Sequence, residues 1–132
     1  IGKDENSHVI NNTVAEDVIF SGDDFYLISL FQNLLDNAKK YSPDGSEINI
    51  YSESNSSKII ICISDQGVGI AEDEKSKIFD RFYRIEDEET RSSKGAGLGL
   101  FLVNQIVKMH GGKIICKNNT PRGSIFELHF KK

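Results

Sequence analysis

The sequence has little proline and cysteine, and it lacks any long hydrophobic run. Only two of its 132 residues are proline, while 38% are hydrophobic and 27% are charged. This is the composition of an ordinary globular protein rather than of a disordered or fibrous one. A chain of this length normally corresponds to one domain with one core. We therefore expect a single domain over residues 1–132, with one functional site.

An excess of positive charge is also missing. The net charge is −4 and the isoelectric point is about 5.4, so no overall positive field would attract a phosphate backbone. We therefore expect no nucleic-acid partner. No run of about 18 apolar residues occurs, and no charged-then-apolar segment opens the chain, which predicts neither a membrane span nor a secretory signal.

These absences predict a cytoplasmic location without membrane contact. The chain opens with Ile1 rather than with methionine, so we expect it to be a piece of a longer parent protein. The sequence leaves open whether that parent is anchored in a membrane.

The two cysteines lie far apart, and each sits inside an apolar stretch. Cys62 belongs to IIICIS and Cys116 to KIICK, where a cysteine usually behaves as a small hydrophobe. We expect neither thiol to be redox-active.

The first half of the chain predicts a helix between strands. Residues 8–20 suit one or two short strands. A turn with an acidic N-cap at residues 22–24 then opens a helix whose apolar residues recur at helical spacing up to residue 42. Residues 47–53 and 57–64 indicate a hairpin whose second strand is central, because that strand is nearly continuously apolar.

The second half predicts a short helix, a long loop, a second helix and a closing hairpin. The short helix is expected across residues 72–79, and the mixed polar stretch 80–96 is expected to be a loop of functional importance. An apolar helix should run from Gly97 to the glycine pair Gly111-Gly112, before a hairpin formed by GKIICK and SIFELHF. The sum is an α+β fold, a two-layer α/β sandwich with helices on one face of a mixed, mostly antiparallel sheet.

A polar stripe lies along the first predicted helix. Asn33, Asn37, Lys40 and Tyr41 stand at i, i+4, i+7 and i+8, on one face of the helix. Two asparagines in a helix interior call for an explanation, because the amide competes for backbone hydrogen bonds. A bound ligand supplies one, since amide oxygens suit Mg²⁺ and lysine suits phosphate. On this stripe alone, a solvated helix face explains the residues equally well.

Two glycine-rich segments strengthen the ligand reading. In DQGVGI, Asp65 ends a buried strand where its carboxylate can accept a hydrogen bond from an exocyclic amine, and two glycines follow. A simple tight turn is the alternative. KGAGLGL stands directly before the second helix, where free backbone N–H groups suit phosphates, although a flexible hinge would also use glycine. Neither a Rossmann fingerprint nor a Walker A loop occurs.

Taken in order, these motifs resemble the catalytic and ATP-binding domain of two-component sensor histidine kinases. That domain has the Bergerat fold of the wider superfamily of gyrase, Hsp90 and MutL ATPases. NLLDNAKKYS is similar to the N box of these kinases, DQGVGI to the first glycine box, IFDRFYRI to the F box and KGAGLGLFLVNQIVKMHGG to the second glycine box. The F box favours histidine kinases over the other members. RGSIFELHF resembles the final strand.

The resemblance implies a role for each site residue. Asn37, helped by Asn33, would hold Mg²⁺, Lys40 and Arg84 would contact phosphates, and Asp65 would recognise adenine. Asn33, Lys40 and Arg84 are thus the expected catalytic residues, and residues 80–96 would form a lid over ATP. The whole expected nucleotide site is Asn33, Asn37, Lys40, Tyr41, Asp65, Gly67, Gly69, Ile70, Arg84, Lys94, Gly95, Gly97, Leu98 and Gly99.

The implied reaction transfers the γ-phosphoryl group of Mg-ATP to a histidine, and then to an aspartate of a response regulator. The acceptor histidine of such kinases lies on a separate dimerisation domain and usually precedes an acidic residue. His8, His110 and His129 precede valine, glycine and phenylalanine. We therefore expect the acceptor domain to be absent, and a monomeric fragment to bind ATP with little self-phosphorylation. A nucleotide-sensing regulatory module and a serine-directed switch kinase remain the alternatives.

Overall fold

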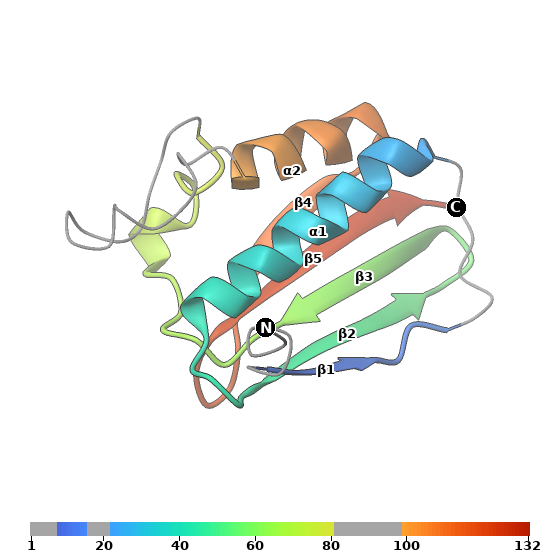
Figure 1. Cartoon of the computed structure of the whole chain (residues 1–132). Helices are drawn as coiled ribbons and strands as arrows, with labels where there is room; N and C mark the ends of the chain where they lie inside the picture. The colour runs from blue at the N-terminus through green and yellow to red at the C-terminus, as the bar shows by residue number, and fades with distance from the viewer. Residues whose placement is uncertain (1–7, 16–21, 81–98) are drawn as a thin grey trace.

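The fold follows from a computed structural model that describes residues 8–15, 22–80 and 99–132. In chain order its elements are β1 (Val9–Asn12), α1 (Asp24–Tyr41), β2 (Glu47–Ser54), β3 (Lys58–Ser64), the 3₁₀ turn η1 (Glu72–Glu74), α2 (Gly99–Met109), β4 (Lys113–Asn118) and β5 (Ser124–Lys131). Figure 1 shows α1 and α2 side by side over one face of the sheet. The predicted two-layer sandwich is confirmed.

The described strands form a five-stranded sheet in the order β1-β2-β3-β5-β4. Strand β1 runs parallel to β2, whereas the pairs β2–β3, β3–β5 and β4–β5 are antiparallel. Strand β3 lies at the centre, as its nearly continuous apolar run predicted. Because β3 is paired with β2 on one side and with β5 on the other, the residue that directly follows it, Asp65, lies between two ordered strands.

The core lies between the two helices and the sheet. Every second residue of a strand faces the helices, and the apolar faces of α1 and α2 close over them. The most deeply buried members are Leu30, Leu34, Ala38, Ile48, Ile59, Ile61, Ile63, Ile78, Val103, Val107, Phe126, Leu128 and Phe130. No helix in the described ranges is long and apolar enough to cross a membrane.

The bounds of α1 follow from local chemistry. The Asp23 side chain accepts a hydrogen bond from the backbone N–H of Tyr26 and so caps the first turn. At the other end, Ser42 has extended backbone angles, φ −103 and ψ 146, as expected of a residue that precedes a proline. The acidic N-cap and the helix end predicted from the sequence are therefore confirmed.

The helix predicted across residues 72–79 was wrong in extent. Only Glu72–Glu74 form a 3₁₀ turn, and turns follow it. A helix this short is not stable by itself, and here tertiary packing fixes the chain instead. Ile78 is buried, and the Phe79 ring packs edge-on against Phe126 with centroids 6.3 Å apart.

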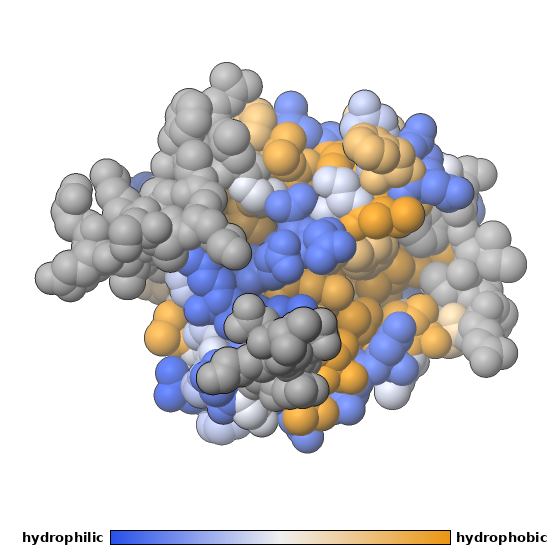
Figure 2. All heavy atoms as spheres, viewed as in Figure 1, coloured by the Kyte–Doolittle hydropathy of each residue, from blue (hydrophilic) through white to orange (hydrophobic). Residues whose placement is uncertain are grey.

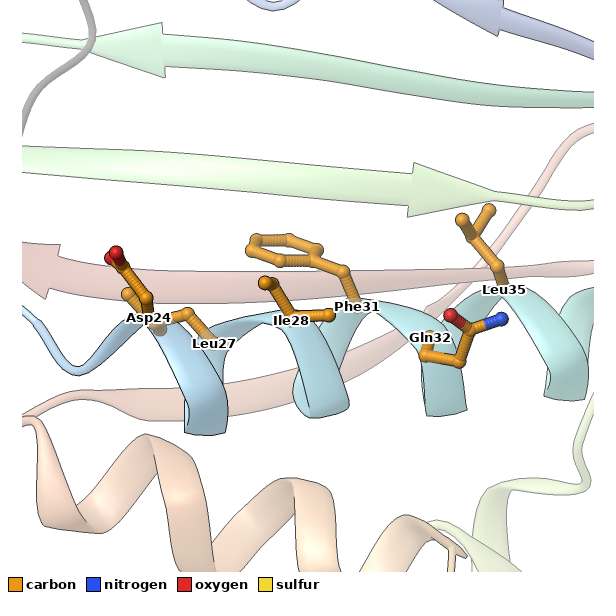
Figure 3. A pocket seen from close by; sticks show the side chains of 6 residues that line it. All are labelled: Asp24, Leu27, Ile28, Phe31, Gln32 and Leu35. Atoms are coloured by element: carbon orange, nitrogen blue, oxygen red, sulfur yellow. The ribbon is translucent and has the colours of Figure 1, made fainter.

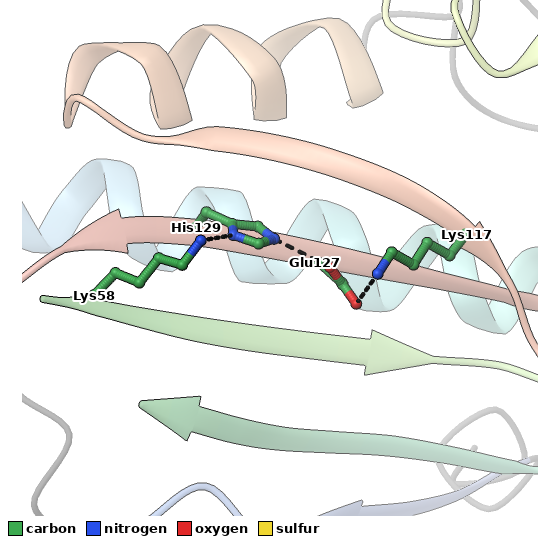
Figure 4. A network of polar contacts seen from close by, with 4 residues as sticks. All are labelled: Lys58, Lys117, Glu127 and His129. Atoms are coloured by element: carbon green, nitrogen blue, oxygen red, sulfur yellow. Dashed lines mark hydrogen bonds and ion pairs between the residues drawn. The ribbon is translucent and has the colours of Figure 1, made fainter. Parts of the chain in front are cut away.

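The sheet face away from the helices carries a polar chain of contacts. His129 lies 3.0 Å from Glu127 Oε1 through Nε2 and 3.5 Å from Lys58 Nζ through Nδ1, while Lys117 Nζ lies 3.2 Å from Glu127 Oε2 (Figure 4). Burial alone would raise the pKa of Glu127, but hydrogen bonds from His129 and Lys117 outweigh it and lower that pKa. His129 is thus a structural residue of the outer face.

Candidate functional site

A small pocket lies where the end of β3 meets the C-terminal half of α1. Its lining combines polar groups with apolar side chains and comes from α1, from the loop after β3 and from the start of β5. The lining residues are Asn37, Tyr41, Asp65, Val68, Gly69, Ile70 and Ser124. Five of them, Asn37, Tyr41, Asp65, Gly69 and Ile70, belong to the site predicted from the sequence.

Asp65 is the buried carboxylate of this pocket, with 4% of its surface exposed. Its Oδ1 accepts two backbone hydrogen bonds, from Gly67 N at 2.9 Å and from Ser124 N at 3.2 Å. Burial raises the pKa of the Asp65 carboxyl above its ordinary value, and the two hydrogen bonds act in the opposite direction. Both of these bonds use Oδ1.

The glycines of the loop are required by close approaches of the backbone. A Cβ at Gly67 would lie 3.1 Å from Asp65 Oδ1 and would collide with the carbonyl of Tyr41. Gly69 has φ +80, a left-handed conformation that residues with a side chain rarely adopt. These contacts explain why glycine stands at residue 67, where a side chain would displace the Tyr41 backbone, whereas the predicted approach of this loop to a ligand stays a prediction.

The polar stripe of α1 leads from this pocket toward the start of α2. The Asn33 amide nitrogen donates to Ser29 O at 2.8 Å, which fixes the amide with its oxygen toward Gly99; a Cβ at Gly99 would lie 3.3 Å from Asn33 Oδ1. Lys40 is exposed, and its Nζ lies 5.4 Å from the centroid of the Tyr41 ring. The stripe therefore joins the pocket to the N-terminus of α2.

Part of the predicted site falls outside the described residues. Arg84, Lys94, Gly95, Gly97 and Leu98 all lie within residues 81–98, as does the predicted lid 80–96 apart from its first residue. Their roles stay predictions. The expected helix start at Gly97 is likewise outside the described residues, and the described part of α2 begins at Gly99.

Sequence reasoning missed the turn between β4 and β5 as part of the site. Asn119 Nδ2 donates to Asp65 O at 2.8 Å, and Arg122 Nε donates to Gly67 O at 2.9 Å. Gly123 lies directly against Asp65 O with φ +107, and Ser124 lines the pocket. The sequence NNTPRG indicated only a hairpin turn, because nothing local reveals contacts to residues more than 50 positions away.

A larger hollow lies elsewhere, beside the N-terminal half of α1. It measures about 370 Å³ and is lined by Asp24, Leu27, Ile28, Phe31, Gln32 and Leu35, which Figure 3 shows as side chains of this one helix. Apolar atoms gather along this side of α1 in Figure 2. Apart from Asp24 and Gln32 its lining is apolar, so it offers few groups that could orient a ligand, and we place the site at the smaller pocket.

All three histidines make structural contacts. His8 Nε2 lies 3.1 Å from Ser42 O, His110 bonds to the backbones of Ile106 and Asp23, and His129 bonds to Glu127. These contacts agree with the structural role expected from the residues that follow each histidine.

The fold and the pocket together define a class of protein, a two-layer sandwich whose polar pocket lies between a helix and the end of the central strand. The family described as histidine kinase-, DNA gyrase B-, and HSP90-like ATPases matches residues 22–132. The chain belongs to this family.

Its relatives include sensor proteins. It is 42% identical over 106 residues to the sensor protein CiaH of Streptococcus pneumoniae, which covers 80% of this chain and 24% of CiaH. It is 41% identical over 100 residues to the sensor protein SrrB of Staphylococcus aureus, which covers 76% of this chain and 17% of SrrB. The chain thus spans a quarter or less of the length of these relatives.

Solved structures show the same fold. A mycobacterial sensor histidine kinase, MprB, superimposes with a TM-score of 0.83 at 29% identity, over 98% of this chain and 85% of that one. The catalytic domain of the histidine kinase ThkA, in a nucleotide-free form, gives a TM-score of 0.81 at 28% identity, over 97% of this chain and 82% of that one. The fold is that of histidine kinase catalytic domains, as predicted.

Proposed function

We propose that this chain binds Mg-ATP and supplies the catalytic half of a histidine kinase. It would transfer the γ-phosphoryl group to a histidine on a separate dimerisation domain of its parent, in a two-component phosphorelay with a response regulator. The observation that carries the proposal is the Asp65 carboxylate, buried at the end of β3 with one oxygen tied to two backbone N–H groups. Its second oxygen is the acceptor for the exocyclic amine of adenine.

The rest of the pocket suits a purine base. Val68 and Ile70 supply apolar surface, and Val68 is 68% exposed, so burying it under a base would be favourable. Tyr41 closes the α1 side. Gly67 and Gly69 keep the floor flat, since a side chain at Gly67 would displace the Tyr41 backbone.

The phosphates would extend from this pocket along α1. Asn33 and Asn37 fit a magnesium site, because amide oxygens together with water and phosphate oxygens are ligands that Mg²⁺ prefers. Bound there, the ion would neutralise charge on the transferred phosphoryl group. Lys40, whose ammonium is exposed at the end of the stripe, would contact phosphate.

The described part of α2 begins at Gly99, and free backbone N–H groups at the N-terminus of this helix would suit phosphates. We propose that residues 80–96 form the lid over ATP and that Arg84 and Lys94 on it reach the phosphates, with Gly95, Gly97 and Gly99 at its hinge and Leu98 beside the nucleotide. We also propose that residues 1–132 form a single domain and that the acceptor histidine lies outside it. Catalysis would then consist mainly of positioning and charge neutralisation.

The test is calorimetric titration of the chain with ATP, ADP and GTP, with and without Mg²⁺. We expect adenine-selective binding by the wild type. Asp65→Asn should lose that selectivity, because its amide can donate toward the amine of the base, and Asn37→Ala should bind without dependence on Mg²⁺. Asp44→Asn, in the exposed turn after α1, and Gln32→Ala, exposed on the same helix, serve as controls that should bind like the wild type.

Two results would contradict the proposal. Failure of the folded wild type to bind any adenine nucleotide would remove the basis for an ATP site. Stoichiometric phosphate on His8, His110 or His129 after incubation with Mg-ATP would show that the acceptor lies inside this chain.

A further inference from the structure

The turn between β4 and β5 is bonded to the loop that carries the candidate base-binding carboxylate. Two side chains of the turn donate to the carbonyls of Asp65 and Gly67, one on each side of Gln66. Asn119 Nδ2 donates to Asp65 O at 2.8 Å, and Arg122 Nε donates to Gly67 O at 2.9 Å. Gly123 lies directly against the carbonyl oxygen of Asp65, and a Cβ at Gly123 would collide with that oxygen.

These bonds act on the same residues that orient the carboxylate. Gly67 donates its N–H to Asp65 Oδ1 and accepts from Arg122 with its carbonyl. Ser124, which directly follows the turn, gives the second N–H to Oδ1. The orientation of the carboxylate therefore depends on where the turn holds Gly67.

We propose that Arg122, assisted by Asn119, is a positioning residue that sets the base selectivity of the nucleotide site by fixing the Asp65 carboxylate. This inference rests on the proposed function and adds to it a residue outside the four motifs. A carboxylate only accepts hydrogen bonds, so it binds a base whose exocyclic amine donates to it. It disfavours a base with a carbonyl at the same position, because two acceptors then face each other. That discrimination requires hydrogen-bond geometry that is held in advance.

The chemistry of arginine suits this task. Its guanidinium is always charged, so its bond to the Gly67 carbonyl is charge-assisted and stronger than a neutral one. The side chain is exposed apart from this bond, so replacing it leaves the core untouched. A change at Arg122 should therefore alter the loop without unfolding the sheet.

The experiment compares ADP with inosine diphosphate, which carries a carbonyl in place of the exocyclic amine. Dissociation constants for both are measured in the wild type, Arg122→Met, Arg122→Lys, Arg122→Gln and Asn119→Ala. Methionine extends as far as the position of Nε but has neither donor nor charge. Lysine keeps a donor and the charge, and glutamine keeps a donor without charge. Lys113→Met removes an exposed cation at the start of β4 and serves as the control for net charge.

We expect Arg122→Met to lower the preference for ADP over inosine diphosphate by about 3-fold to 10-fold, as befits the loss of one charge-assisted hydrogen bond. Lysine should restore most of the preference and glutamine part of it. Asn119→Ala should act in the same direction, and Lys113→Met should leave the ratio unchanged. A loss of phosphate attraction alone would weaken both nucleotides equally.

Amide exchange of Gly67 in the nucleotide-free protein gives a second readout that does not depend on binding. We expect its N–H to exchange faster in Arg122→Met than in the wild type or in Arg122→Lys. An unchanged ADP preference in folded Arg122→Met and Asn119→Ala, with wild-type binding intact, would overturn this inference and leave the proposed function standing. A wild type that binds no adenine nucleotide would instead overturn the proposed function, and the selectivity role with it.

Discussion

The Nε2 atom of His110 accepts a hydrogen bond from the backbone N–H of Asp23 at 3.1 Å, so the end of α2 is bonded to the N-cap of α1. Its other ring nitrogen, Nδ1, lies 2.8 Å from Ile106 O. A carbonyl can only accept, so Nδ1 carries the proton and Nε2 offers its lone pair to Asp23. One neutral imidazole thus joins the two helices that cover the sheet.

His110→Phe should therefore lower the free energy of unfolding. Phenylalanine has a similar ring but cannot make either bond, which leaves the Asp23 N–H without its partner. Because Asp23 is exposed, water can bond to the freed N–H, so we expect a loss of about 0.5 to 1.5 kcal/mol, measured by urea denaturation followed by circular dichroism. His8→Phe, which removes the bond to Ser42 O near the edge strand and leaves the two helices joined, should cost less. Equal stability of His110→Phe and wild type would refute the bridge.

Gly123→Ala and Gly45→Ala form a matched pair of substitutions at glycines with positive φ. Gly45 has φ +84 with no atom within 4 Å of an added Cβ, whereas Gly123 has φ +107 and faces the Asp65 carbonyl. Alanine at residue 45 should cost about 1 to 2 kcal/mol through backbone strain alone. At residue 123 the strand ends must also separate, so we expect more than about 4 kcal/mol. Similar thermal midpoints for the two variants would contradict the packing of the turn on Asp65.

The two thiols should react slowly with a disulfide reagent in the native protein. Cys62 is 2% exposed, and burial raises the pKa of both Cys62 and Cys116 to about 11. At pH 8 each is therefore less than about 1% thiolate, the reactive form. We expect Cys62, measured in Cys116→Ala, to be labelled only as fast as the protein unfolds. Cys116, measured in Cys62→Ala, should react sooner because it is only half-buried. Fast labelling of Cys62 would contradict its burial.

Local patterns in the sequence were sufficient for much of this fold. The acidic N-cap at Asp23, the end of α1 before Pro43 and the two hairpins depend on neighbouring residues, and the structure confirms them. Asp65 was predicted at the end of a central strand, and it lies there, buried. Such features are encoded over a few positions, where periodicity and capping rules apply.

The contacts that could not be predicted join distant parts of the chain. Asn119 and Arg122 reach the loop after β3 only because β4 and β5 return beside it, and their turn sequence indicates nothing beyond a turn. The segment 72–79 was predicted to be a short helix, yet it stops after a 3₁₀ turn because Ile78 and Phe79 anchor on the core. Tertiary packing decided the conformation there.

Asp65→Asn should raise the stability of the fold at neutral pH and lower its affinity for adenine nucleotides. Burial raises the pKa of the Asp65 carboxyl above its ordinary value of 3.8, so the folded protein holds this proton more tightly than the unfolded chain. The stability linked to this group is therefore complete below about pH 3.8 and is lost as the pH rises through the folded pKa. At neutral pH the ionised carboxylate lowers the stability of the fold.

Asparagine is neutral at every pH and keeps an oxygen for the N–H groups of Gly67 and Ser124. We therefore expect Asp65→Asn to unfold at a higher urea concentration than the wild type at pH 7, and this advantage to shrink as the pH falls toward 3.8. Affinity for adenine nucleotides should fall by about 100-fold, because the amide presents a donor to the amine of the base. Asp44→Asn controls for the loss of one negative charge. An Asp65→Asn protein less stable than the wild type at pH 7 would mean that the carboxylate stabilises the loop, and that its burial carries no cost.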